Sequence, residues 1–96
     1  MKTLLEKQWN GKELREIVEF NGKKFKIVTG LRNGLNPSKV YLFTDNGLEV
    51  ILFPADLPVS NWLKSLSYVS PESQRKTYAE SLNVMFKQAI KKIYHK

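Results

Sequence analysis

Apolar and polar residues alternate on both sides of the Asn21-Gly22 dipeptide. The segment Leu14 to Phe20 precedes it, and the segment Lys24 to Leu31 follows it. Asn-Gly is the strongest short signal for a two-residue hairpin turn, because both residues tolerate a positive φ. The pattern therefore predicts an antiparallel hairpin whose loop pairs Phe20 with Lys23, Glu19 with Lys24, Val18 with Phe25 and Ile17 with Lys26.

The predicted pairing gives this hairpin two unlike faces. The apolar face collects Leu14, Val18, Phe20, Phe25 and Ile27, and the polar face collects Arg15, Glu19, Lys24 and Lys26. Such alternation is typical of an antiparallel sheet that is buried on one side only. We expect the second face to be exposed, partly salt-paired across the strands and net basic.

A second hairpin is predicted around the turn residues Thr44 to Gly47. The flanking segments, Val40 to Phe43 and Val50 to Phe53, are apolar at consecutive positions. Strands that are apolar on both faces are usually buried on both faces. We therefore expect this hairpin to lie in the centre of the sheet or to be covered on both sides.

Helices are predicted at both ends of the chain. Residues 2–9 offer a short one carrying Leu4, Leu5 and Trp9. A second short helix is expected around Trp62. The longest begins near Ser70, a good N-cap, with Pro71 at the first helical position. Its apolar stripe at helical spacing consists of Tyr78, Ala79, Leu82, Met85, Phe86, Ala89, Ile90 and Ile93.

The sequence thus predicts an α+β fold, with a four-stranded antiparallel sheet of two hairpins. A short N-terminal helix and C-terminal helices are expected to pack on this sheet. We divide the chain into a sheet region, residues 1–55, and a helical region, residues 56–96. The two regions are expected to form either separate units or one compact unit.

Composition narrows the classes of protein that fit. The chain has 96 residues, of which 42% are hydrophobic and 26% charged, as in an ordinary globular domain. It has no cysteine, so disulfides and thiolate metal sites are excluded. We see no signal peptide and no membrane span, and expect a cytoplasmic location.

The net charge of +7 is unevenly distributed. Residues 21–39 hold five basic residues and no acid, and residues 81–96 hold four lysines and no acid. Between them, residues 40–63 carry only three charged groups, the acids Asp45, Glu49 and Asp56. Two basic blocks on two elements indicate a surface for phosphates. The alternative is that the lysines only solvate the surface.

The region 57–96 resembles the start of the core-binding domain of tyrosine recombinases of the phage-integrase type. The resemblance is carried by Trp62-Leu63-x-x-Leu66, a loop, Ser70-Pro71-x-Ser73, Arg75, Tyr78, Leu82 and Phe86. These domains usually have Thr where this chain has Ser73. The resemblance implies that the second helix lies against DNA. The family's catalytic Arg/Lys/His cluster and nucleophilic Tyr have no counterpart in the chain.

Candidate DNA-binding residues come from charge and from the resemblance. Charge and exposure indicate Lys23, Lys24, Lys26, Arg32 and Lys91, and the resemblance adds Ser70, Ser73, Arg75, Lys76, Asn83 and Lys87. By the 100° step per residue, one side of the last helix, away from its apolar stripe, carries Lys76, Glu80, Asn83, Lys87 and Lys91. Several of them have a structural alternative: helix capping for Ser70, edge protection for Lys23 and Lys24, and plain solvation for Asn83. Arg32 lies in a segment that can be a plain link between hairpins, and Arg75 can pack or pair internally.

We expect no catalysis by this chain alone and no cofactor or metal. His95 is the only histidine, so a histidine-based triad or multi-histidine metal site is not available. Glu16 and Glu19 are expected on opposite faces of a strand, so they do not form a carboxylate pair. No glycine-rich phosphate-binding motif is present.

The leading functional hypothesis is a non-catalytic, DNA-binding N-terminal portion of a tyrosine recombinase or phage integrase, with double-stranded DNA as its partner. The alternative is a small phage or mobile-element protein that binds and inhibits a host defence protein or nucleoprotein complex. In that case, the apolar second hairpin or the region of Trp62 and Tyr68 would dock the partner. Self-association and an RNA ligand also remain open. No membrane partner is expected.

Overall fold

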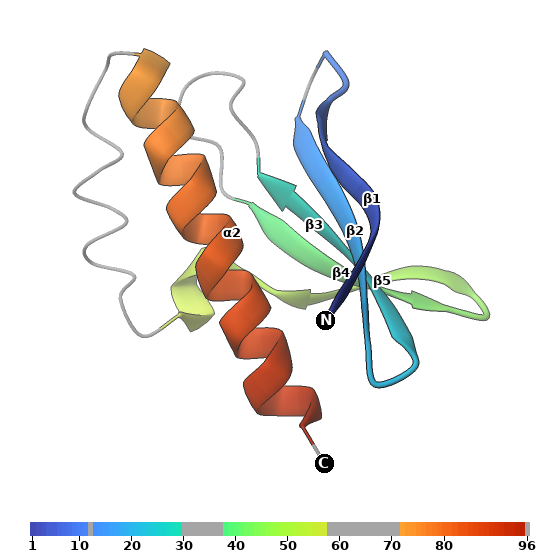
Figure 1. Cartoon of the computed structure of the whole chain (residues 1–96). Coiled ribbons are helices and arrows are strands. Elements are labelled where there is room, and N and C mark those ends of the chain that lie inside the picture. The colour runs from blue at the N-terminus through green and yellow to red at the C-terminus, as the bar shows by residue number, and fades with distance from the viewer. Residues whose placement is uncertain (12, 30–37, 58–71, 96) are drawn as a thin grey trace.

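The computed structural model describes residues 1–11, 13–29, 38–57 and 72–95. The elements are β1 (Lys2–Trp9), β2 (Leu14–Phe20), β3 (Lys23–Thr29), β4 (Lys39–Thr44), β5 (Gly47–Leu52), the short 3-10 turn η1 (Pro54–Asp56) and α2 (Glu72–Tyr94). The strands form one antiparallel sheet in the order β1-β2-β3-β4-β5, and α2 crosses one face of it (Figure 1). The predicted α+β class, with an antiparallel sheet and a C-terminal helix, is confirmed. The predicted helix around Trp62 lies outside the described residues.

The β2–β3 hairpin has the predicted register. Val18 pairs with Phe25 and Glu19 pairs with Lys24. Asn21 has φ 53° and Gly22 has φ 77°, which are the left-handed values that a tight two-residue turn requires. The turn chemistry therefore fixes which side chains of the two strands lie on each face of the sheet.

The predicted N-terminal helix is wrong, because residues 2–9 form strand β1. This strand pairs with β2, with irregularities on both sides of Leu5. Leu4 and Trp9 are 40% and 51% exposed, so the apolar residues that indicated a helix do not form a buried stripe. Pairing with the free edge of β2 satisfies backbone groups that a strand edge otherwise leaves open. The sheet consequently has five strands instead of four.

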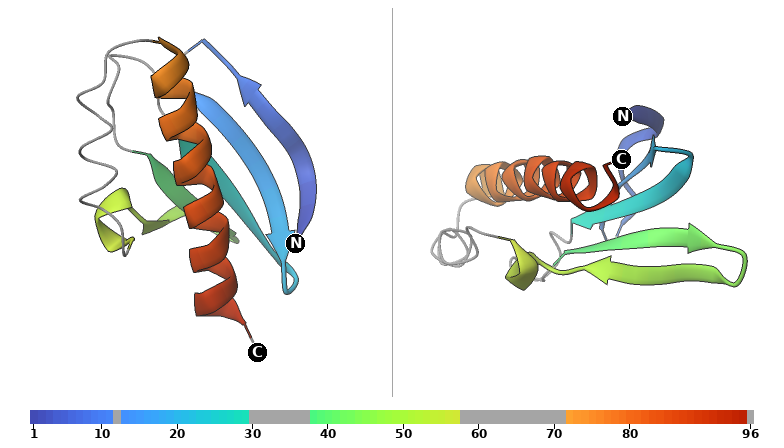
Figure 2. Two further views of the ribbon diagram at one scale, coloured as in Figure 1. Left: turned by 60° about the vertical axis from the view of Figure 1, so that its left-hand side comes forward. Right: turned by 90° about the horizontal axis from the view of Figure 1, so that it is seen from below.

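The β4–β5 hairpin forms at the predicted turn, but its predicted central position is wrong. β5 is an edge strand, and Leu48 and Val50 on it are exposed. Figure 2 shows why: α2 lies on one side of the sheet, and no described element covers the other side. The β4–β5 hairpin is therefore partly exposed, although its strands are apolar on both faces.

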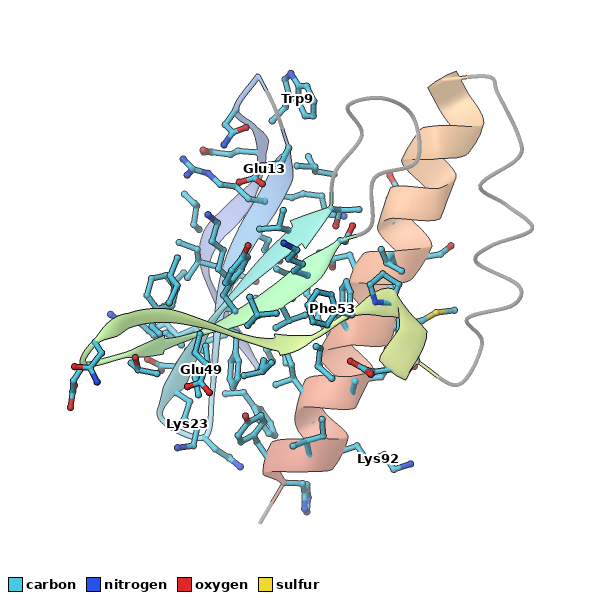
Figure 3. The ribbon with its side chains drawn as sticks, turned by 180° about the vertical axis from the view of Figure 1, so that it is seen from behind. Trp9, Glu13, Lys23, Glu49, Phe53 and Lys92 are labelled. Atoms are coloured by element: carbon cyan, nitrogen blue, oxygen red, sulfur yellow. The ribbon has the colours of Figure 1, made fainter. Side chains whose placement is uncertain are left out.

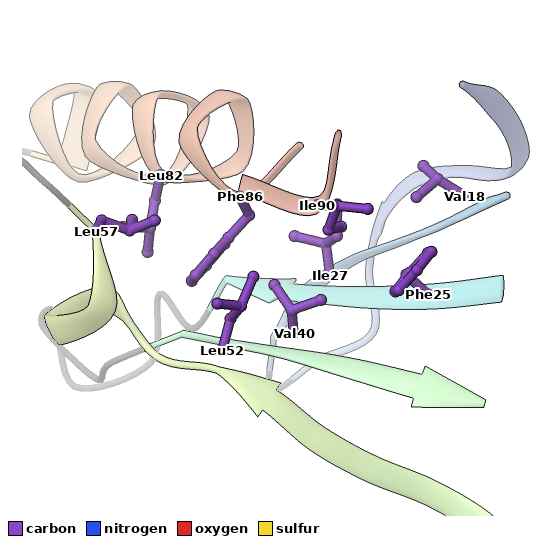
Figure 4. Packing of buried hydrophobic residues seen from close by; sticks show 9 residues of the cluster. All are labelled: Val18, Phe25, Ile27, Val40, Leu52, Leu57, Leu82, Phe86 and Ile90. Carbon is purple, nitrogen blue, oxygen red and sulfur yellow. The ribbon is translucent and has the colours of Figure 1, made fainter. Parts of the chain in front are cut away.

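The core lies between α2 and the sheet. Leu82, Phe86 and Ile90 point from α2 towards the strands (Figure 4), and all three are fully buried. One buried cluster is formed by residues of the strands, of α2 and of the segment that follows η1. Its members are Val18, Phe25, Ile27, Val40, Leu52, Leu57, Leu82, Phe86 and Ile90. The predicted apolar stripe is confirmed at Leu82, Phe86 and Ile90, whereas Ile93 is exposed. The side chains of Tyr78 and Ala79 lie outside the described part of the chain.

Candidate nucleic-acid interface

The side of the sheet that faces away from α2 is called the open face here. Its residues follow from the register, because paired residues of antiparallel strands point to the same side. Glu16, Val18, Phe25, Ile27 and Val40 are buried on the α2 side, so their chain neighbours lie on the open face. Three cross-strand rows result, listed from β1 to β5: Lys2, Glu19, Lys24, Phe43 and Leu48; Leu5, Ile17, Lys26, Tyr41 and Val50; and Gln8, Arg15, Val28 and Lys39.

The open face is strongly basic. It carries five cations, Lys2, Arg15, Lys24, Lys26 and Lys39, and two carboxylates, Glu19 on β2 and Glu13 just before β2. Within the described residues, only Lys26 among these cations has an ion pair, 3.6 Å from Glu13 Oε1. The remaining cations on this face have no carboxylate within ion-pair distance among the described residues. Their positive charge is therefore available to an anionic ligand.

Aromatic rings lie among these cations. The Lys26 ammonium is 5.7 Å from the ring centre of Tyr41, and the Lys39 ammonium is 6.0 Å from that of Phe53. Phe53, at the end of β5, is 44% exposed and is seen in Figure 3, which views the molecule from the side opposite α2. Phe43 is 39% exposed and lines a shallow pocket together with Lys24. Each of the three rings therefore has a lysine beside it.

Two predicted binding residues of α2 contact the sheet instead. Asn83 is 4% exposed, and its Nδ2 donates a hydrogen bond of 2.9 Å to Glu16 Oε1. Lys87 Nζ donates a hydrogen bond of 2.9 Å to Glu16 Oε2 and forms an ion pair with it. A buried carboxylate needs such partners, because desolvating an unpaired charge is costly. Asn83 and Lys87 thus hold α2 against β2.

The other predicted residues are divided between two sides of the sheet. Lys24 and Lys26 lie on the open face, whereas Lys23 has the opposite strand parity and is exposed at the β2–β3 turn. Lys91 is exposed on α2. The sheet and helix cations therefore do not form one continuous surface. Arg32 and Ser70 lie outside the described residues, as do the side chains of Ser73, Arg75 and Lys76.

The sequence patterns did not indicate the aromatic part of this face or the buried carboxylate. Tyr41, Phe43 and Phe53 were expected to be covered, and Lys39 was not among the candidates. The burial of Glu16 could have been predicted from the sequence, because Glu16 lies between Leu14 and Val18 on the apolar side of the predicted hairpin. An acid at such a position requires a donor from the element that packs on it.

No family model, curated protein or solved structure matches this chain. Among residues 1–11, 13–29, 38–57 and 72–95, no group of three or more acidic or histidine side chains could hold a metal ion. In the same part of the chain, no helix is long and apolar enough to cross a membrane. The open face is the candidate site because basic side chains and exposed rings lie together on it.

Proposed function

We propose that this chain is a non-catalytic nucleic-acid-binding module that holds DNA on the open face of its sheet. The observation that carries the proposal is the charge of that face, where five cations accompany two carboxylates. Four of these cations have no ion pair among the described residues. Lysine and arginine contacts with phosphates release counterions, which gives affinity without base recognition.

The test is a mobility-shift titration of a DNA duplex at about 50 mM and about 200 mM salt. We expect binding that weakens steeply as salt increases. Lys24→Gln should lower the affinity at low salt and reduce the slope of log affinity against log salt by about 1, because one phosphate contact is lost. Lys92→Gln is the matched control, since Lys92 is exposed on α2 and is not on the open face.

Two results would contradict this proposal. One is the absence of binding at about 50 mM salt, where electrostatic contacts are strong. The other is an equal loss of affinity in Lys24→Gln and Lys92→Gln. That would indicate a general effect of net charge with no role for the open face.

The narrower proposal places this module in a tyrosine recombinase, where it would position DNA while another domain cleaves the strand. Its support is the resemblance of residues 57–96, of which 58–71 lie outside the described residues. Reading the gene beyond Lys96 tests it. A continuing frame that encodes an Arg/His/Tyr catalytic domain supports the proposal, and a stop codon with no recombinase gene nearby contradicts it.

A second candidate function is the binding of a host protein, and one observation favours it. The edge hairpin exposes four large apolar side chains: Phe43, Leu48, Val50 and Phe53. Exposed apolar patches with a free strand edge are typical of protein docking surfaces. Val50→Ser should then abolish retention of a host protein in a nuclease-treated pulldown. Retention that disappears with nuclease treatment favours nucleic acid instead.

A further inference from the structure

We infer that the open face binds single-stranded nucleic acid, with bases stacked on Tyr41, Phe43 and Phe53 and phosphates held by the lysine beside each ring. This inference rests on the proposed function and specifies its ligand. A charged surface alone binds any polyanion, whereas exposed rings add a contact that only unpaired, accessible bases can make.

The exposed rings are not needed for the core. Phe25 and Phe86 fill it and are fully buried, whereas Phe43 and Phe53 lie outside the core cluster and are accessible. Tyr41 has the same strand parity as Phe43, is half-buried and is also outside that cluster. Exposing aromatic surface to water is unfavourable. A stacking role accounts for rings that contribute little to the packing of α2 on the sheet.

The spacing of the rings favours an unpaired strand. Tyr41 and Phe43 are two residues apart on β4, so their side chains emerge about 6.7 Å apart. Consecutive bases of one strand in a duplex rise by about 3.4 Å and remain stacked on each other. Neighbouring bases can occupy neighbouring rings only after they unstack and the backbone extends. A duplex cannot do this without melting.

Each ring has a lysine near it, and the lysine near Tyr41 is also ion-paired with Glu13. Lys26 lies by Tyr41, Lys39 lies by Phe53, and Lys24 shares a pocket with Phe43. A base on a ring brings its phosphate within reach of an ammonium group on the adjacent strand. Since the three pairs span β3, β4 and the end of β5, the bound strand would cross this part of the sheet.

The experiment is fluorescence anisotropy with the complete chain at about 50 mM salt. The probes are labelled oligothymidylate and oligouridylate of about 15 nucleotides and a duplex of equal length. We expect the protein to bind the single strands with an affinity at least about 10-fold higher than its affinity for the duplex. The two single-stranded probes distinguish DNA from RNA as the source of the ligand.

Ring variants test stacking directly. Tyr41→Ala and Phe43→Ala should each weaken single-strand binding by about 5- to 100-fold with an unchanged salt slope, because stacking releases no counterions. Tyr41→Phe should bind like the unaltered protein. Leu48→Ala is the matched control, since Leu48 pairs with Phe43 and is exposed but has no ring. Thermal unfolding verifies that each variant is folded, and Phe53→Ala replaces any that is not.

The outcomes separate this inference from the proposed function. Salt-dependent binding that is equal or tighter for the duplex overturns the inference and leaves DNA binding intact. The absence of binding to all probes overturns both. If Leu48→Ala loses as much affinity for the single strands as Phe43→Ala does, stacking is overturned and the face is a general apolar docking surface.

Discussion

At the scale of single residues, Glu16 is the most consequential polar side chain. It is buried in the sheet and accepts hydrogen bonds from Asn83 and Lys87, which come from a helix 67 and 71 positions further along the chain. Polar contacts within an apolar interface are directional, so they discriminate between rotations of α2 that bury similar apolar area. Glu16 thus helps to define how the helix lies on the sheet.

Lys87→Met should destabilise the fold. The substitution keeps most of the apolar stem but removes the ammonium group, which leaves the buried carboxylate with Asn83 as its remaining partner. The expected loss in the free energy of unfolding is about 1–3 kcal/mol. Urea denaturation measures it. Lys91→Met, at an exposed position one turn further along α2, should stay within about 0.5 kcal/mol of the unaltered protein.

Equal stability of Lys87→Met and Lys91→Met would contradict this assignment. A double substitution that also replaces Glu16 by Gln tests the coupling of the pair. Once the carboxylate is absent, loss of the ammonium should matter less, so the two effects should not add.

At the scale of elements, α2 is held mainly by its apolar stripe. Phe86→Ala should lower the free energy of unfolding by about 3–5 kcal/mol, because it leaves a cavity between the helix and the sheet. Val84→Ala is the matched control, since Val84 is 54% exposed on the same helix and Ala has the higher helix propensity. Chemical denaturation of both variants measures the difference, and similar midpoints would contradict the packing described above.

The elements also show what local sequence can and cannot specify. The β2–β3 register follows from Asn21-Gly22, because a two-residue turn leaves one pairing of its flanking strands. Residues 2–9 contain no comparable local signal. Leu4, Leu5 and Trp9 fit a short helix, and their strand conformation depends on a partner, β2, whose free edge the local pattern does not reveal.

The candidate site was predictable only in part. Lys24 and Lys26 follow from alternation along β3, and they lie on the exposed face as expected. Tyr41 and Phe53 could not be assigned to that face, because β4 and β5 are apolar at consecutive positions and hydrophobicity alone does not show which side is covered. Asn83 and Lys87 are polar residues on an amphipathic helix, and only the tertiary contact with Glu16 places them against the sheet.

At the scale of the whole molecule, sheet and helix share one core. The buried cluster takes Val18, Phe25, Ile27 and Val40 from the strands and Leu82, Phe86 and Ile90 from α2. Without α2, the sheet would expose these strand residues to water. A small sheet with an exposed apolar face lacks the burial that independent folding needs.

A chain shortened to residues 1–57 should therefore not fold by itself. We expect poorly dispersed amide signals in a two-dimensional NMR spectrum and no cooperative thermal transition, whereas residues 1–96 should give dispersed signals and one transition. A dispersed spectrum for 1–57 would instead support the division of the chain into a sheet unit and a helical unit.

The arrangement of the sheet also bears on how this protein diverges in evolution. Core side chains lie on the α2 side, and the ring–lysine pairs lie on the other. Substitutions at exposed positions away from structural contacts usually change stability little. Mutations can thus accumulate on the open face without compensating changes under α2. Relatives that keep the Glu16 contacts and the apolar stripe would retain this fold while acquiring different ligand preferences.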